Sequence, residues 1–208
     1  LIYQKTGQKD KAENLFKELG KNAATSSRMV MVAVDTYISQ KRYDDAVIVF
    51  SELLKADPDN DNLNFFLGMA HESADNPEAA IQHYLNVSSA HPQYKKTLLT
   101  IGFLYRKMGQ GEKAVAFLEG HHKNNPKDID IISYLSTFYE QEGHLEKAMD
   151  LLTKGLADVP ENTSLLFRLG AIQDKAGQKE ACIATMKKII RIDPDDASAL
   201  NYLGYTYA

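Results

Sequence analysis

The stretch KKTLLTIGFLYRKMGQGEKAVAFLEGHHKNNPKD, residues 95–128, carries the pattern that decides the fold. Apolar residues recur at helical spacing from Leu98 to Met108, and Gly109 follows them, where a residue free to adopt a left-handed conformation ends a helix well. A second apolar helical face comes next. It consists of Ala114, Val115, Phe117 and Leu118. Pro126 cannot continue this second helix. The stretch therefore predicts two antiparallel helices joined by a short turn.

The same spacing recurs along the whole chain. Four glycines lie 34, 68 and 34 residues apart, at Gly68, Gly102, Gly170 and Gly204. Prolines recur at Pro58, Pro92, Pro126, Pro160 and Pro194, and acidic residues at Asp10, Asp44, Glu78, Glu112, Glu146 and Glu180. Each acidic residue falls where a second helix begins, and a negative charge in a first turn favours the helix dipole. Several registers agree on a period of 34 residues, which indicates a repeat protein.

A single helix pair cannot bury its apolar faces alone, but a stack of pairs can. The predicted fold class is therefore all-α: a right-handed superhelical solenoid of antiparallel helix pairs. We expect a single array over 1–208. Its parts are a half-repeat at 1–26, full repeats at 27–60, 61–94, 95–128, 129–162 and 163–196, and the first helix of a further repeat at 197–208. Since Tyr3 and Tyr207 occupy the same repeat place, both ends fall inside helices. This favours a piece of a longer array, with possible self-association through its cut ends.

Composition excludes several classes of function. The 208 residues hold 24 Lys and Arg against 28 Asp and Glu, a formal charge of −4. No basic surface is predicted, so we expect no nucleic-acid partner. No apolar run approaches the ~20 residues that span a bilayer, so direct membrane insertion is not expected. Cys182 is the single cysteine, which excludes an internal disulfide. A soluble protein of the cytoplasm or of a bacterial periplasm fits equally well.

The residues that could carry chemistry do not form a recognisable constellation. The sequence has no nucleophile elbow, no phosphate-binding glycine loop and no HExxH motif, so we predict no enzyme, cofactor or metal site. The adjacent His121 and His122 would point ~100° apart on a helix, and we expect solvated side chains there. His71 replaces a repeat tyrosine and is expected to be a partly buried packing residue. Cys182 replaces a repeat alanine and is expected to be small and buried.

This pattern resembles the tetratricopeptide repeat family, whose motif orders a large apolar residue, Leu-Gly, Tyr, Ala, a large apolar residue and Pro. In residues 95–128 the motif is Leu98, Ile101-Gly102, Tyr105, Ala114, Leu118 and Pro126. The resemblance implies that first helices line a concave groove where ligands bind. The groove residues it implies are Met31, Phe65, Met69, Leu99, Phe103, Arg106, Phe167, Tyr202 and Tyr205.

The resemblance implies a scaffold or adaptor that binds a peptide segment or a partner protein in this groove. Exposed apolar side chains of this kind mark partner sites. The competing interpretation is that the same side chains pack between neighbouring first helices. A second hypothesis for function is a substrate-presenting arm of a larger enzyme, such as a glycosyltransferase. The sequence does not identify the partner.

Overall fold

The computed structural model describes residues 11, 14, 18, 37 and 40–207. Every regular element in this part of the chain is an α-helix, which confirms the predicted all-α class. The helices are α4 (Tyr43–Ala56), α5 (Asp61–Ser73), α6 (Pro77–Leu85), α7 (Tyr94–Lys107), α8 (Gly111–Asn124), α9 (Ile129–Gln141), α10 (Leu145–Asp158), α11 (Thr163–Lys175), α12 (Lys179–Ile192) and α13 (Ala197–Tyr207). The chain divides into unit 1 (Leu1–Met108), which contains α4–α7, and unit 2 (Gly109–Ala208), which contains α8–α13.

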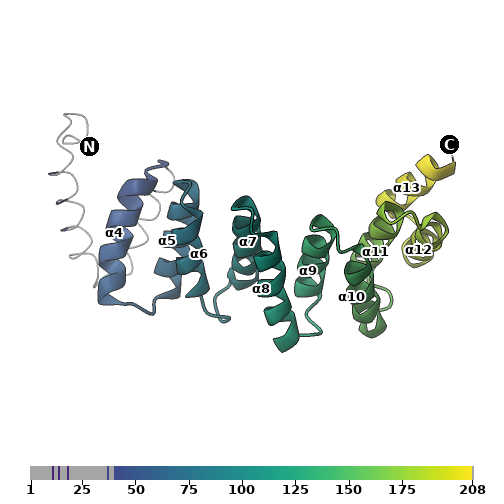
Figure 1. The fold of residues 1–208 in the computed structure, drawn as a ribbon, viewed down its shortest axis with the longest axis horizontal. Helices are drawn as coiled ribbons and strands as arrows, with labels where there is room; N and C mark the ends of the chain where they lie inside the picture. Colours follow the sequence, from purple (N-terminus) through teal and green to yellow (C-terminus); the bar gives the residue numbers. More distant parts are fainter. Residues whose placement is uncertain (1–10, 12–13, 15–17, 19–36, 38–39, 208) are drawn as a thin grey trace. The chain divides into compact units, whose positions relative to one another are not determined.

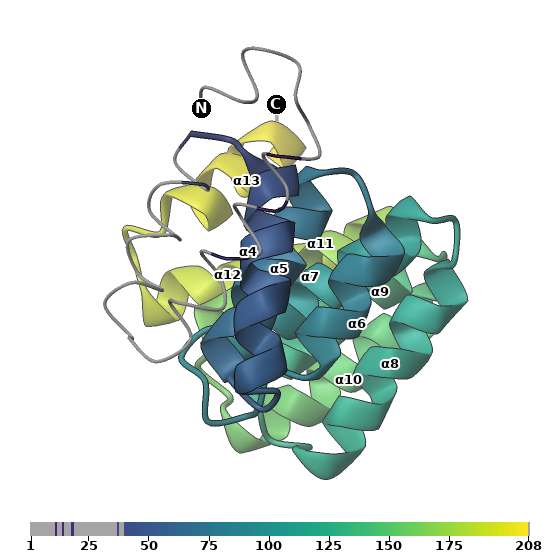
Figure 2. The same ribbon diagram turned by 90° about the vertical axis from the view of Figure 1, so that its left-hand side faces the viewer.

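Unit 1 is built by packing consecutive helices. Figure 2 shows α4 lying against α5, and α5 in turn packs against α6, which packs against α7. Apolar residues of α4 and α5 form a shared core with Tyr37, which precedes α4. Its buried members are Tyr37, Ala46, Val49, Phe50, Leu53, Leu63, Leu67 and Ala70. The rings of Phe50 and Phe66 join the two helices at 6.2 Å. The core thus lies between one helix pair and the next.

Unit 2 continues the same arrangement. Pairs α9–α10 and α11–α12 lie side by side with short turns, and α8 and α13 pack on the outer members (Figure 1). Its largest fully buried side chains are Leu118, Ile132, Leu135, Phe138, Leu152, Leu165, Ile172 and Met186. A polar contact also joins neighbouring helices, because the Tyr139 hydroxyl on α9 donates to Glu119 Oε1 on α8 at 2.5 Å. The pKa of the Tyr139 hydroxyl is raised, mainly by burial and to a smaller extent by this hydrogen bond.

The turn inside each helix pair has a positive φ at one repeat place. The angles are 56° at Lys41, 59° at Asp75, 72° at Gly109, 82° at Gly143 and 77° at Gly177. The next N–H donates back to the first helix, as His144 N does to Tyr139 O at 2.7 Å and Gln178 N to Gln173 O at 2.8 Å. This is the hydrogen bond of a Schellman C-cap. The glycine stop predicted at Gly109 is confirmed. Gly143 and Gly177 adopt the same turn, and Lys41 and Asp75 adopt it without glycine.

The prolines mark the other connection, from a second helix to the next first helix. The chain closes an i to i+3 turn around each of the five recurring prolines. The bonds are Asn60 N to Asp57 O at 3.2 Å, Tyr94 N to His91 O at 2.9 Å, Asp128 N to Asn125 O at 3.1 Å, Asn162 N to Val159 O at 3.0 Å and Asp196 N to Asp193 O at 3.2 Å. Proline suits the second place of such a turn because its φ is already fixed there. The last turn residue then caps the following helix, and Asn162 Oδ1 accepts from Leu165 N at 2.9 Å.

Helix α6 departs from the uniform period. It has 9 residues, whereas α4, α8, α10 and α12 have 14 each. The reason lies at Ser88, whose backbone N–H donates to Asp61 Oδ1 at 2.9 Å and whose hydroxyl donates to Asp61 Oδ2 at 2.5 Å. Bonds of this kind compete with helix continuation. Residues 86–93 therefore fold over the start of α5 instead of extending α6.

The smaller sequence predictions are also met where the structure describes them. Asp44, Glu78, Glu112, Glu146 and Glu180 each lie in the first turn of a second helix. Cys182 is buried and unpaired with another cysteine, and burial raises the pKa of its thiol. The other acidic place of the register, Asp10, lies outside the described residues.

Gly68 allows α5 and α6 to approach, and this contact can be tested. A Cβ at Gly68 would lie 2.5 Å from the ring of Tyr84, which is only 3% exposed and whose hydroxyl donates to Glu72 at 2.7 Å. The Tyr84 ring cannot move away easily, because its Cβ is fixed on α6 and its hydroxyl is bonded to Glu72. Gly68→Ala should therefore lower the free energy of unfolding by about 1–3 kcal/mol in urea titrations.

The matched control is Gly120→Ala in α8, where an added Cβ meets nothing within 4 Å. The removal of a mid-helix glycine should stabilise by roughly 0.5–1 kcal/mol there. Equal effects of the two substitutions would contradict a tight contact at Gly68.

Candidate functional site

Five of the predicted groove residues lie on two first helices of unit 1. Phe65 and Met69 are on α5, and Leu99, Phe103 and Arg106 are on α7. Both helices pack against α6. Phe103 is 44% exposed, whereas the other four are half-buried. This set contains the large aromatic side chain that is most accessible in the described part of unit 1.

Phe65 is held by its own repeat. Its ring lies 6.1 Å from the ring of Tyr84 on α6 and 5.2 Å from that of His91, in the segment that follows α6. His91 is itself fixed, because its Nδ1 accepts from Gln93 N–H at 3.1 Å and its Nε2 lies 3.3 Å from Asn62 Oδ1. An acceptor at Nδ1 leaves the proton on Nε2, so His91 donates to Asn62. Phe65 therefore behaves largely as a packing residue.

The segment behind Phe65 is held by the carboxylate of Asp61. Both oxygens of Asp61 accept from Ser88, through its hydroxyl and its backbone N–H. Both bonds lower the pKa of the Asp61 carboxyl, and the bond from the Ser88 hydroxyl has the larger effect. Residues 86–93 are thus held beside Phe65 at the start of α5, a feature that the repeat period does not predict.

In unit 2 the predicted residues lie on α11 and α13. Phe167 is half-buried on α11. Tyr202 on α13 is half-buried, and burial raises the pKa of its hydroxyl, with hydrogen bonds to Cys182 and Asp174 adding to the effect. Tyr202 is thus tied to α11 and α12. Met31 and the side chain of Tyr205 lie outside the described residues.

Arg168 is a polar feature of α11 that the predicted set does not include. Its Nε donates to the Ser136 hydroxyl on α9 at 3.0 Å, and its other end lies 3.9 Å from Glu140 Oε2. Glu140 also accepts from Lys175 Nζ at 3.1 Å. The Arg168 side chain is 28% exposed, and burial lowers the pKa of its guanidinium. Helix α11 therefore carries an ion-paired arginine next to Phe167 in the sequence.

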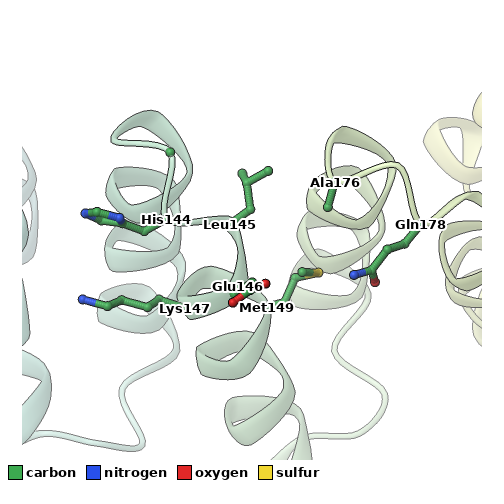
Figure 3. A pocket seen from close by; sticks show the side chains of 8 residues that line it. His144, Leu145, Glu146, Lys147, Met149, Ala176 and Gln178 are labelled. Carbon is green, nitrogen blue, oxygen red and sulfur yellow. The ribbon is translucent and has the colours of Figure 1, made fainter.

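One open pocket of about 540 Å³ lies in unit 2, where α10 begins beside the α11–α12 turn. Figure 3 shows Glu146 and Met149 of α10 on one side and Gln178 on the other. The lining residues are Gly143, His144, Leu145, Glu146, Lys147, Met149, Ala176 and Gln178. They include no hydroxyl or thiol side chain, so the pocket contains neither a serine nor a cysteine nucleophile.

The two adjacent histidines differ from the prediction. His121 and His122 were expected to be solvated, but both are half-buried. The ring of His121 packs edge-on against Phe117 at 4.7 Å, and His122 lines a hollow together with Leu135 and Tyr139. Burial lowers the pKa of each. Among the described residues there is no group of three or more His, Cys, Asp and Glu placed to hold a metal. No helix in the described ranges is long and apolar enough to cross a bilayer.

These features define a helical-repeat protein with an accessible aromatic side chain on its first helices. Family models described as "Tetratricopeptide repeat" match residues 1–61, 31–94 and 139–203, which together cover well over half of the chain. The chain belongs to the tetratricopeptide repeat family, and it is in general terms a protein-interaction scaffold. A comparison with curated proteins finds no match.

Solved structures show the same fold at low sequence identity. PilW, titled a widely conserved type IV pilus biogenesis factor, is 18% identical with a TM-score of 0.61, covering 97% of this chain and 94% of that one. YrrB, titled a TPR protein with an unusual peptide-binding site, is 16% identical with a TM-score of 0.58, covering 82% and 88%. MamA is 19% identical with a TM-score of 0.58, covering 79% and 96%.

Phe65 and Phe103 should respond differently to truncation. Phe65→Ala removes ring contacts within one repeat and should lower the free energy of unfolding by about 1–3 kcal/mol. Phe103→Ala removes a more exposed ring and should cost clearly less. Urea denaturation followed by circular dichroism measures both. A larger loss for Phe103→Ala would show that Phe103 is the packing residue and Phe65 the accessible one.

Proposed function

We propose that this chain binds an extended peptide segment of a partner protein along the first-helix face of unit 1. The segment would lie over Met69, Leu99, Phe103 and Arg106. One observation carries the proposal: Phe103, a large aromatic residue, is 44% exposed on a first helix. Aromatic side chains of this kind dominate the binding energy of protein interfaces.

The surroundings of Phe103 suit a peptide. Leu99 lies one turn before it on α7 and adds aliphatic surface to the same helix, and Met69 lies on α5, which packs against α6 as α7 does. Methionine adapts its shape to different partners. Arg106 lies on α7 as well, and a guanidinium group suits the carboxylate and backbone carbonyl groups of a peptide. YrrB, which has the same fold, is described as a TPR protein with an unusual peptide-binding site, and this supports a peptide as the ligand here.

Phe65 has a different part in the proposal. Because Tyr84 and His91 hold its ring, it would support the edge of the face and contribute little contact area. A non-catalytic scaffold is the proposed role. As the substrate-presenting arm of a larger enzyme, the chain would use the same face.

The proposal predicts that binding depends on Phe103 and not on an equally exposed apolar residue elsewhere. Peptides selected from a random display library against the chain should lose at least about tenfold in affinity with Phe103→Ala, because truncation removes a central aromatic anchor. Isothermal titration calorimetry with one selected peptide measures the change.

Leu85 is the matched control, since it is 52% exposed at the end of the second helix α6. Leu85→Ala should leave the affinity within about twofold of the wild-type value. If Leu85→Ala weakens binding and Phe103→Ala does not, the second-helix side is the binding face and the proposal fails.

A further inference from the structure

Two histidines face each other within the α5–α6 pair. His71 lies in the last turn of α5 and His83 in the last turn of α6. Their rings are stacked, with centroids 5.4 Å apart and planes 5° from parallel. Both side chains are half-buried. Two groups that titrate near neutral pH therefore share one contact inside a repeat.

The hydrogen bonds of His83 define its neutral form. Asn64 is 1% exposed, and its Nδ2 lies 3.4 Å from Pro58 O and 3.3 Å from Asn60 O. Its Oδ1, which can only accept, lies 3.3 Å from His83 Nδ1. Nδ1 therefore carries the proton of neutral His83, and a second proton would be added at Nε2. The buried asparagine holds the ring in place for stacking.

Burial and proximity both oppose a charge on this pair. Burial lowers the pKa of His71. The pKa of His83 is lowered as well, mainly by burial and to a smaller extent by the charge of His71. Each histidine lies in the last turn of its helix, where the dipole favours a cation, but the lowered pKa values show that burial outweighs this effect.

The charged groups on the packed elements are engaged with one another or lie elsewhere. The carboxylates with partners are Asp45 with Arg42 and Glu52 with Lys55 on α4, Asp61 of α5 with Ser88, Glu72 of α5 with the Tyr84 hydroxyl, and Asp75 with Lys107 of α7. Asp44 and Glu78 lie in the first turns of α4 and α6. Helix α7 adds Tyr94 and the cations Lys95, Lys96, Arg106 and Lys107. A carboxylate that would stabilise a protonated pair is not among the bonds of His71 or His83.

We propose that the His71–His83 stack is an acid-sensitive joint that holds α6 against α5 at neutral pH and opens when the rings are protonated. Below a pH of about 6.5 an opened pair binds more protons than the closed one, so the closed pair loses stability as the pH falls. Above that pH both rings are neutral and the pair is fully stable.

The joint also bears on recognition, and this part rests on the proposed function. Phe65 lies between Tyr84 of α6 and His91, and α7, which carries Phe103, packs against α6. Opening of the pair would separate these supports from α5. We therefore expect a peptide bound at Phe103 to be released at mildly acidic pH.

The first test is a histidine titration of the whole chain by NMR. His83 should titrate below the range of an ordinary histidine, and His71→Tyr should raise its pKa, because the neighbouring charge is removed. Tyrosine is a conservative choice, since Tyr37 and Tyr139 occupy the same repeat place and are buried. An unchanged titration of His83 in His71→Tyr would overturn the proposal.

The second test follows local opening by hydrogen exchange, corrected for intrinsic rates, at about pH 7.5 and about pH 5.5. Residues 61–86 should lose about tenfold or more of their protection at the lower pH. Residues 163–192 contain no histidine and serve as the internal control. His71→Tyr, or His83→Gln if the first variant does not fold, should restrict the loss in 61–86 to that of the control. Equal loss in both segments of the wild-type chain would overturn the joint.

A third measurement separates this inference from the proposed function. Affinity for a display-selected peptide should fall at the lower pH in the wild-type chain and much less in His71→Tyr. If residues 61–86 open while the affinity stays constant, the joint stands and the binding face lies elsewhere. If neither opening nor affinity depends on the two histidines, the joint is wrong whatever the binding face.

Discussion

The turn inside each helix pair is the constraint on which the structure depends. At residues 41, 75, 109, 143 and 177 the chain takes a positive φ. In the turns with Arg42, Asn76, His144 and Gln178, the next N–H bonds back to a carbonyl of the first helix. This geometry reverses the chain within three residues, so the apolar faces of the two helices meet. Without that reversal each helix would expose a stripe that only a neighbour can cover.

The repeat tolerates change in residue type where the backbone geometry is kept. Lys41 and Asp75 adopt the left-handed turn that glycine adopts at Gly109, Gly143 and Gly177. A non-glycine residue pays a conformational cost there, which packing of the surrounding helices offsets. The period therefore identifies a backbone requirement more reliably than it identifies a residue.

The individual features of the chain arise where the repeat is broken. The hydrogen bonds from Ser88 to Asp61 end α6 early and place the ring of His91 against that of Phe65. His71, in a place that holds tyrosine in other repeats, stacks on His83. In unit 2, Arg168 reaches Ser136 across two first helices. Each of these contacts joins residues from different elements, and each gives its repeat a polar or titratable group that a regular repeat lacks.

The sequence by itself determined the class of the fold, the helix pairs, the places of most of their turns and the presence of apolar helix faces that need a neighbour. These follow from local periodicity, since a helix of 3.6 residues per turn fixes which side chains share a face. Proline and glycine at fixed intervals fixed most connections. The pairing of Gly68 with the ring of Tyr84, by contrast, could not be read from spacing, because the two residues lie on different helices.

Only the tertiary structure decided which groove residues are packing residues and which are accessible. Phe65 and Phe103 are both aromatic residues on first helices, and both fit the predicted face equally. Phe65 is held by Tyr84 and His91, whereas Phe103 stays 44% exposed. The physical reason is that exposure depends on what neighbouring elements place over a side chain. That depends on long-range contacts such as the bond from Ser88 to Asp61, which no local pattern records.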